Sequence, residues 1–235
     1  MKFLTAEWLN LIMLNWEIEP RLLGDIVPKG TELDYWGGKT FVSLVGFQFN
    51  NTKVMGVKIP FHVNFAEVNL RFYVIRRVGE EIRRGVVFIK EFVPRWWIAF
   101  IARKFYNENY FAVRMNHDIT LRDGRIGVEY QWETGSKLNS IFIEAGNNLV
   151  ELEDNSFEEF FAGHYCGYVK QPDGSTREYR VTHPRWRFSA AGDVKTCLNN
   201  VELYGEAIGG ILQSSPSSAF LLDGSIVTVG FGKKI

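Results

Sequence analysis

The feature that most constrains this 235-residue chain is a period-two alternation of apolar and polar residues, clearest between Glu67 and Val74. Successive side chains of a β-strand point to opposite faces, so the alternation predicts a strand with one apolar and one polar face. The apolar positions are Val68, Leu70, Phe72 and Val74, and the polar positions are Glu67, Asn69, Arg71 and Tyr73. We therefore expect four chemically different polar side chains to project together from one side of a sheet.

Turn signals divide much of the remaining chain into further strand-like segments. Apolar and β-branched residues are dense at 41–49 and 85–89, which predicts strands there. Three turn signals are Asp123-Gly124, Pro172-Asp173-Gly174 and Asp223-Gly224. Each separates two strand-like segments, which predicts three β-hairpins, the last of them joining residues 219–222 to 226–231.

Helical signals are fewer. Residues 94–106 begin with proline at the favoured first helical position and carry an apolar stripe at helical spacing. Segment 155–161 contains a Ser-x-x-Glu capping signature, and segment 20–27 predicts another short helix. No linker-like stretch divides the chain. We therefore predict an α+β fold, a mainly antiparallel β barrel or sheet with a few short helices, in a single domain over residues 1–235.

Charge balance and apolar patterning limit the class of protein. The 27 Lys and Arg residues balance 27 Asp and Glu residues, so neither nucleic acid nor an anionic membrane is an expected partner. Aromatic residues reach 15%, with 19 Phe and 7 Trp, which predicts an aromatic core. No stretch of 18 apolar residues predicts a transmembrane helix. Glu7 and Asn10 flank or break the N-terminal apolar run, which argues against a signal peptide and leads us to expect a cytoplasmic protein.

The spacing of cysteine and histidine favours neither a disulfide framework nor a metal centre. Cys166 and Cys197 are expected to be free, buried thiols, although one bridge between them is compatible with the sequence. Together with His164 and His183 they lack the paired spacing of structural zinc sites. The chain also has no P-loop, no Gly-x-Ser-x-Gly and no Gly-x-Gly-x-x-Gly. We predict no metal and no cofactor.

A set of motifs occurs in a characteristic order along the chain. In sequence they are Trp16-x-Ile18-x-Pro20, Gly37-Gly38, Glu67-Val68-Asn69-Leu70-Arg71-x-Tyr73-Val74, Gly85-x-x-Phe88, Ala102-Arg103, Phe157-x-x-Phe160-Phe161 and His183-Pro184-x-Trp186. This order resembles the YqjF-like family, a domain of unknown function (DUF2071) that itself resembles the acetoacetate decarboxylase fold. The resemblance extends from about Trp8 to Phe231. It implies an acetoacetate decarboxylase-like fold but brings no settled activity with it.

The resemblance also implies a departure from decarboxylase chemistry. The related decarboxylases form a Schiff base between a lysine and the ketone of the substrate. Here Tyr110 and Phe111 stand where the lysine pair would be, and no lysine occurs between Lys104 and Lys137. A phenol and a phenyl group cannot form an imine, so we predict that Schiff-base chemistry is absent. Glu67 matches the glutamate of the decarboxylase pocket.

Two groups of polar residues are candidates for a ligand-binding site. They are Glu67, Arg71 and Tyr73 on the alternating strand and Arg103, Tyr106, Tyr110 and Arg114 in and after the predicted helix. A planar guanidinium suits a carboxylate, so Arg71 is expected to anchor an anionic ligand and to pair with Glu67 when the cavity is empty. The residues alone also allow a solvated strand face with a cross-strand salt bridge, and an Arg103 that only caps a helix.

Three functions fit these residues. The first is binding of a small, carboxylate-bearing organic molecule, which predicts a closed, partly apolar pocket with Glu67 or Arg71 at its base. The second is a protein-interaction module with a filled barrel and an exposed apolar patch. The third is a lyase or hydrolase that uses Glu67 and His183 in acid–base catalysis, although His183 is equally suited to holding a turn. Whether the chain is an enzyme, and whether it forms a homo-oligomer, is left open.

Overall fold

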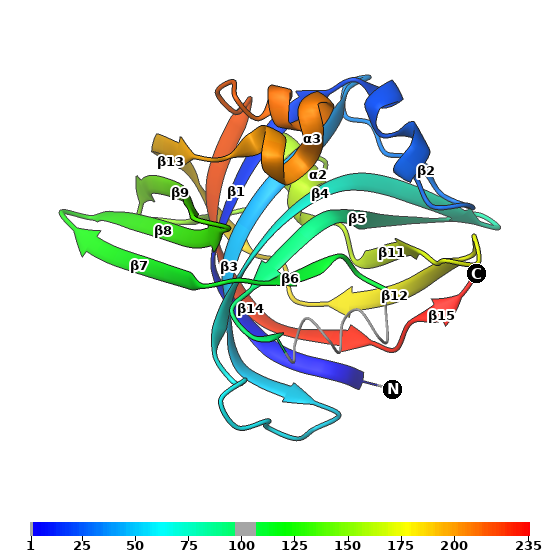
Figure 1. Ribbon diagram of the computed structural model, residues 1–235, viewed down its shortest axis with the longest axis horizontal. Helices are drawn as coiled ribbons and strands as arrows, with labels where there is room; N and C mark the ends of the chain where they lie inside the picture. Colours follow the sequence, from blue (N-terminus) through cyan, green and yellow to red (C-terminus); the bar gives the residue numbers. More distant parts are fainter. Residues whose placement is uncertain (1, 97–106) are drawn as a thin grey trace.

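Strands dominate the computed structural model, which describes residues 2–96 and 107–235 (Figure 1). The longer strands around the centre are β1 (Lys2–Ile18), β3 (Thr40–Val54), β4 (Phe65–Val78), β5 (Glu81–Val93), β11 (Cys166–Lys170), β12 (Thr176–Thr182), β13 (Arg187–Cys197) and β14 (Ser218–Gly230). The others are β2 (Glu32–Leu33), β6 (Tyr110–Ala112), β7 (Met115–Arg122), β8 (Arg125–Thr134), β9 (Lys137–Gly146), β10 (Val150–Glu151) and β15 (Lys233–Lys234). The described part also contains the helices α2 (Phe157–Ala162) and α3 (Asn200–Ile211), and short 3-10 turns at Pro20–Leu22 and Gly24–Ile26.

The strands form one 15-stranded sheet in which most neighbours are antiparallel, so the prediction of a mainly antiparallel sheet is confirmed. Its main path runs β15-β12-β11-β5-β4-β3-β1-β14-β13-β9-β8-β7. Both β11 and β6 pair in parallel with β5. Because β12 also pairs with β14, at Val181–Val229 and Thr182–Thr228, the sheet bends and brings these two strands together. The central strand β4 lies between β3 and β5 (Figure 1).

Two of the three predicted hairpins are present and the third is wrong. Strands β7 and β8 pair around Asp123-Gly124, and β11 pairs with β12 around the Pro172-Asp173-Gly174 turn. The third turn signal lies inside β14, which continues through it and pairs with β1 along almost its whole length. Gly224 takes φ +80° there, and a Cβ would lie only 1.9 Å from the carbonyl oxygen of Trp8. Glycine at this position therefore permits a close approach of two strands rather than a reversal of the chain.

The predictions of helices have different outcomes. The capping signature is confirmed, because Ser156 Oγ accepts a hydrogen bond of 3.1 Å from the Glu159 N–H at the start of α2. Segment 20–27 forms 3-10 turns instead of a helix, and residues 97–106 of the predicted helix 94–106 lie outside the described ranges. Strands β1, β9 and β13 and helix α3 were not predicted. Their residues lack strict alternation, and α3 is kinked at Gly205.

The two faces of β4 meet different surroundings. Its apolar residues join a buried cluster with Trp16, Tyr130 and Trp132, between β4 and the β8–β9 strands. The opposite face turns toward a second apolar cluster that includes Phe160 and Phe161 of α2. The polar side of β4 is therefore enclosed by protein, and it is not a solvated outer face.

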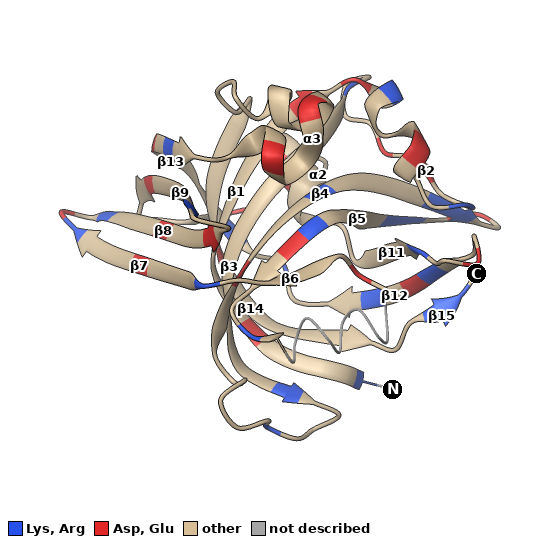
Figure 2. Ribbon diagram, in the orientation of Figure 1, with Lys and Arg blue, Asp and Glu red and all other residues tan. Residues whose placement is uncertain are grey.

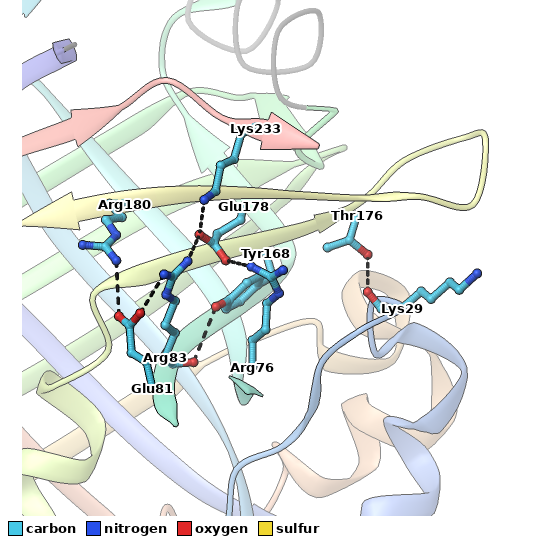
Figure 3. Close-up of polar contacts among 9 residues, drawn as sticks. All are labelled: Lys29, Arg76, Glu81, Arg83, Tyr168, Thr176, Glu178, Arg180 and Lys233. Atoms are coloured by element: carbon cyan, nitrogen blue, oxygen red, sulfur yellow. Dashed lines mark hydrogen bonds and ion pairs between the residues drawn. The ribbon is translucent and has the colours of Figure 1, made fainter. Parts of the chain in front are cut away.

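Charged side chains gather at one end of β4, β5, β12 and β15 (Figure 2). Within this group Glu178 of β12 is buried and is contacted by three cations, as Figure 3 shows. Its carboxylate lies 2.6 Å from Arg76 Nη1, 3.0 Å from Arg83 Nη1 and 3.5 Å from Lys233 Nζ. This network joins β4, β5 and β15 to β12.

Both cysteines are free. Cys166 is buried on β11, as expected, whereas Cys197 is exposed at the end of β13, so the expectation of two buried thiols is wrong for Cys197. Within the described ranges, no helix is both long and apolar enough to cross a membrane.

Candidate ligand-binding cavity

A cavity of about 430 Å³ opens between the strands, within the size range of small-molecule sites. Its wall is mainly aromatic and aliphatic. The aromatic contributors are Phe3 and Trp8 of β1, Phe47 and Phe49 of β3, Phe65 of β4, Phe88 of β5, Tyr110, Phe161, Tyr179 and Trp186. A few polar residues interrupt this wall, and three of them are the alternating β4 residues Glu67, Asn69 and Arg71. The alternation of β4 therefore directs both the acid and the guanidinium into one enclosed space.

Glu67 is held at the wall by two hydrogen bonds. Its carboxyl oxygens accept from Asn69 Nδ2 at 2.9 Å and from Tyr110 Oη at 2.9 Å. The residue is only 2% exposed. Burial raises the pKa of Glu67 to about 7, although the two hydrogen bonds and the charge of Arg71 act in the opposite direction. This carboxyl group can therefore both hold and release a proton near neutral pH.

Two further carboxyl groups lie close to Glu67. Glu108 accepts a 2.9 Å hydrogen bond from Tyr179 Oη and lines the same cavity. Burial, with a contribution from the charge of Glu67, raises the pKa of Glu108 to about 8. Glu91 lies behind them on β5, and burial together with the charges of Glu108 and Glu67 raises its pKa well above the usual value. Three buried acids thus lie close together, and two of them, Glu67 and Glu108, are on the cavity wall.

Arg71 brings the positive charge to this cavity. Its Nη2 donates to the carbonyl oxygen of Phe161 at 3.3 Å and lies 4.0 Å from Met13 Sδ, and its Nε is buried without a partner. No carboxylate of the described residues lies within 4.0 Å of this guanidinium. The expected Arg71–Glu67 ion pair is therefore wrong, because Asn69 and Tyr110 occupy the carboxyl oxygens of Glu67.

Three histidines also line the cavity, namely His62, His164 and His183, and the last two have informative contacts. His164 Nε2 lies 3.0 Å from Asp34 Oδ2, and burial lowers the pKa of this imidazole. The ring of His183 stacks on Trp186 with centroids 3.8 Å apart, and its Nδ1 lies 2.8 Å from the carbonyl oxygen of Pro184. Both contacts of His183 are those expected of a residue that holds a turn. Glu67 and His183 do line one cavity, as acid–base catalysis by this pair requires.

The other predicted site residues differ in whether they line the cavity. Tyr110 lines the cavity. Tyr73 does not, because its hydroxyl lies 2.6 Å from Ser43 Oγ and its ring packs on Phe160 and Phe161; placing it at the site was wrong. Arg114 was also misplaced, since its side chain is 82% exposed and lies 3.4 Å from Glu133. Arg103 and Tyr106 fall outside the described ranges, so their predicted roles are not assessed by the structure.

Sequence reasoning missed Glu91, Glu108, Tyr179 and His164 as neighbours of Glu67 or Arg71. Glu108 and Tyr179 are 71 positions apart, and no local pattern marks either as buried. A signal for Glu91 was present in β5, where it and Lys90 interrupt an otherwise apolar run over residues 86–93. Within the described ranges, no three His, Cys, Asp or Glu side chains are grouped so that they could hold a metal ion.

Comparison with solved structures defines the class of fold. The chain superposes on acetoacetate decarboxylase from Legionella pneumophila with a TM-score of 0.69 and 12% identity, covering 98% of this chain and 86% of that one. It is similarly close to the enduracididine biosynthesis enzyme MppR, solved with the condensation product of pyruvate and imidazole 4-carboxaldehyde, with a TM-score of 0.68, 9% identity and coverage of 98% and 88%. An acetoacetate decarboxylase-like enzyme from Sphingomonas wittichii RW1 gives 0.64, 11% identity and coverage of 100% and 93%. The fold is acetoacetate decarboxylase-like.

The family follows from sequence comparison. The chain belongs to DUF2071, a family described as uncharacterized conserved proteins, whose model matches residues 5–224. A relative is the uncharacterized protein YqjF of Bacillus subtilis, 26% identical over 112 residues. That match covers 47% of this chain and 45% of YqjF, so it spans less than half of that protein. The resemblance inferred from the ordered motifs is confirmed.

Proposed function

We propose that the cavity binds a small organic molecule through a carboxylate group that contacts Arg71. The observation that carries the proposal is a guanidinium without a carboxylate partner among the described residues, on the wall of a largely apolar cavity. A cation removed from water is costly unless it is paired. Among the described residues, Arg71 contacts a carbonyl oxygen, a thioether and the face of the Tyr73 ring, 5.7 Å from its centroid, and none of these is an anion. A ligand carboxylate would supply the missing charge in a bidentate geometry.

The remainder of the ligand would be apolar or aromatic. The wall beside Arg71 and Glu67 contains Phe47, Phe49, Phe65 and Trp8, whose rings pack against one another with centroid distances between 4.6 and 5.5 Å. An open interior of this volume favours ligand binding over an interaction module with a filled barrel. The pairing of β12 with β14 supports the view that the curved sheet acts as a barrel-like container for the ligand.

The test is a binding measurement with hexanoate as the probe. Arg71→Ala should weaken hexanoate binding by at least tenfold, because charge-assisted hydrogen bonds contribute about 1.5–3 kcal/mol. Arg71→Lys should not restore it fully, since a point charge cannot reproduce the planar fork. Arg114→Ala is the matched control, because this arginine is exposed outside the cavity and should leave binding unchanged. Equal affinity in the wild type and in Arg71→Ala would refute the proposal.

We also propose that the site works without Schiff-base chemistry. Tyr110 occupies the wall at the position that the resemblance assigns to a lysine, and its hydroxyl donates to Glu67. No lysine is found among the described residues that line the cavity. Incubation with acetoacetate and borohydride should therefore yield no reduced adduct on the protein, as measured by mass spectrometry of tryptic peptides. An adduct on any lysine between residues 90 and 140 would contradict this proposal.

A further inference from the structure

A ligand that contacts Arg71 in this cavity must also face Glu67 and Glu108, the two buried acids that line it. Glu67 and Arg71 are four residues apart on β4, which separates their Cα atoms by roughly 13 Å in a regular strand. From this arrangement we infer that Glu67 and Glu108 bind a protonated amine of the same ligand, so that the ligand is zwitterionic. The inference rests on the proposed function, because it assumes that Arg71 holds the carboxylate.

The first observation is that these acids have no cation within ion-pair distance among the residues that the structure describes. Glu67, Glu91 and Glu108 are 2%, 1% and 6% exposed, and none forms an ion pair with a described residue. Buried carboxyl groups are normally paired with a cation, as Glu178 is in this same molecule. A cationic group bound in the cavity would remove this imbalance.

The second observation concerns unpaired hydrogen-bond acceptors at the same place. Asn69 is 1% exposed and lines the cavity, and its amide donates to Glu67 while its Oδ1 has no partner. Glu91 Oε2, next to these acids but outside the cavity lining, is likewise buried and unpaired. Glu108 uses one oxygen for Tyr179, and no described residue donates to the other. An ammonium group has three N–H donors and no acceptor, so it complements this set of oxygens.

The charge state of the acids gives the inference a distinct signature. With pKa values of about 7 for Glu67 and about 8 for Glu108, both groups are at least partly protonated at neutral pH. A bound ammonium favours the ionised carboxylates, so binding at pH 7 releases protons from these carboxyl groups to solvent. The other titratable or charged groups that face them are Arg71 of β4, Glu91 of β5, Tyr110 of β6 and Tyr179 of β12. The two tyrosines stay neutral, because burial raises the pKa of each hydroxyl further.

Matched straight-chain probes test the inference. Calorimetric titrations at pH 8.5 compare 6-aminohexanoate with hexanoate and hexylamine, and a series from 4-aminobutanoate to 8-aminooctanoate samples the spacing. At this pH Glu67 and Glu108 are more than half ionised, and the amine is still protonated, since alkylammonium groups titrate near pH 10.4. We expect the best ω-amino acid to bind at least tenfold more tightly than the carboxylate of equal length. Titration at pH 7 in two buffers of different ionisation enthalpy should show proton release for the amino acid and none for hexanoate.

Variants test which carboxyl groups are responsible for the tighter binding of the amino acid. Glu67→Gln and Glu108→Gln should each reduce the ratio of amino-acid affinity to hexanoate affinity severalfold, whereas the exposed control Glu151→Gln should leave this ratio unchanged. If hexanoate binds through Arg71 but no amino acid of the series binds more tightly, the inference fails and the proposed function stands. If hexanoate binding does not depend on Arg71, the proposed function fails, and this inference fails with it. Proton release by the wild type does not require any variant to fold.

Discussion

Two regions of this protein bury a carboxyl group to the same extent but shift its pKa in opposite directions. Glu178 of β12 and Glu67 of β4 are 1% and 2% exposed. Around Glu178, burial acts to raise the pKa, but the hydrogen bond from Arg76 and the charges of Lys233, Arg76 and Arg83 more than offset it, so its pKa is lowered (Figure 3). Glu67 has an amide and a phenol as partners, and its pKa rises to about 7.

The difference shows that burial alone does not decide the charge of an acid in this fold. Both carboxyl groups lose water, but only Glu178 gains permanent cations in exchange. The Glu178 network joins several strands, and both oxygens of its carboxylate are paired with cations, so the network is suited to stabilising the fold. The acids of the cavity keep unused acceptor oxygens and a proton that can leave, which suits them to respond to a ligand.

The largest expected effect is loss of stability when Glu178 is removed. Glu178→Ala leaves Arg76 and Arg83 at a partly buried site without their carboxylate, which should lower the free energy of unfolding by about 3 kcal/mol. Equilibrium urea unfolding at pH 7 measures this change. Glu81→Ala is the matched control, because Glu81 contacts Arg83 from the exposed side of the same network and should have a much smaller effect. Equal losses in both variants would mean that the buried position is not special.

A smaller effect of opposite pH dependence is expected at the cavity. Glu67 has a folded-state pKa of about 7 against an ordinary value of 4.5, so the folded protein holds this proton more tightly than the unfolded chain. Stability linked to Glu67 is therefore complete below about pH 4.5 and is lost as the pH rises through 7. Glu178 behaves in the reverse way, since its pKa is lowered and its contribution disappears only on acidification below the ordinary glutamate value.

Glu67→Gln, which resembles the neutral acid, separates these two contributions. It should match the wild type at pH 5 and exceed its stability at pH 9 by roughly 2 kcal/mol, because no carboxylate is then ionised at that buried position. Urea unfolding at pH 5, 7 and 9 provides the measurement, with Glu151→Gln as the exposed control. A variant less stable than the wild type at all three pH values would show that Glu67 is needed as a charged group.

The smallest expected effect is that of chelator and reductant. Both cysteines are free, and the described acids do not form a metal-type cluster, so EDTA and dithiothreitol should each change the melting temperature by no more than a few degrees. Differential scanning calorimetry on the purified protein measures this. A large fall in melting temperature with EDTA would indicate that a structural metal ion supplies positive charge next to the cavity acids, because such a metal contributes directly to folding free energy.

The residue order alone was enough to predict the strand character and one face of the site. Alternation in 67–74 correctly placed Glu67 and Arg71 on the same side of one strand, since the side-chain period of a strand is local geometry. The same argument misplaced Tyr73, because a strand residue can share a face with a site and still lie beyond its edge, where the Tyr73 hydroxyl contacts Ser43 and its ring packs on Phe160. Asp223-Gly224 predicted a turn, yet a glycine with positive φ also fits within a continuous strand.

The tertiary structure decided which side chains contact one another and how far each is removed from water. Glu108 and Tyr179, or Asp34 and His164, come together only because distant strands share one sheet, and no local pattern encodes such a pairing. The raised pKa of Glu67 likewise depends on burial, which outweighs its two hydrogen bonds and the charge of Arg71, and burial is a property of the whole fold. Local sequence specifies the direction of a side chain, whereas its electrostatic surroundings are the sum of contacts from the whole fold.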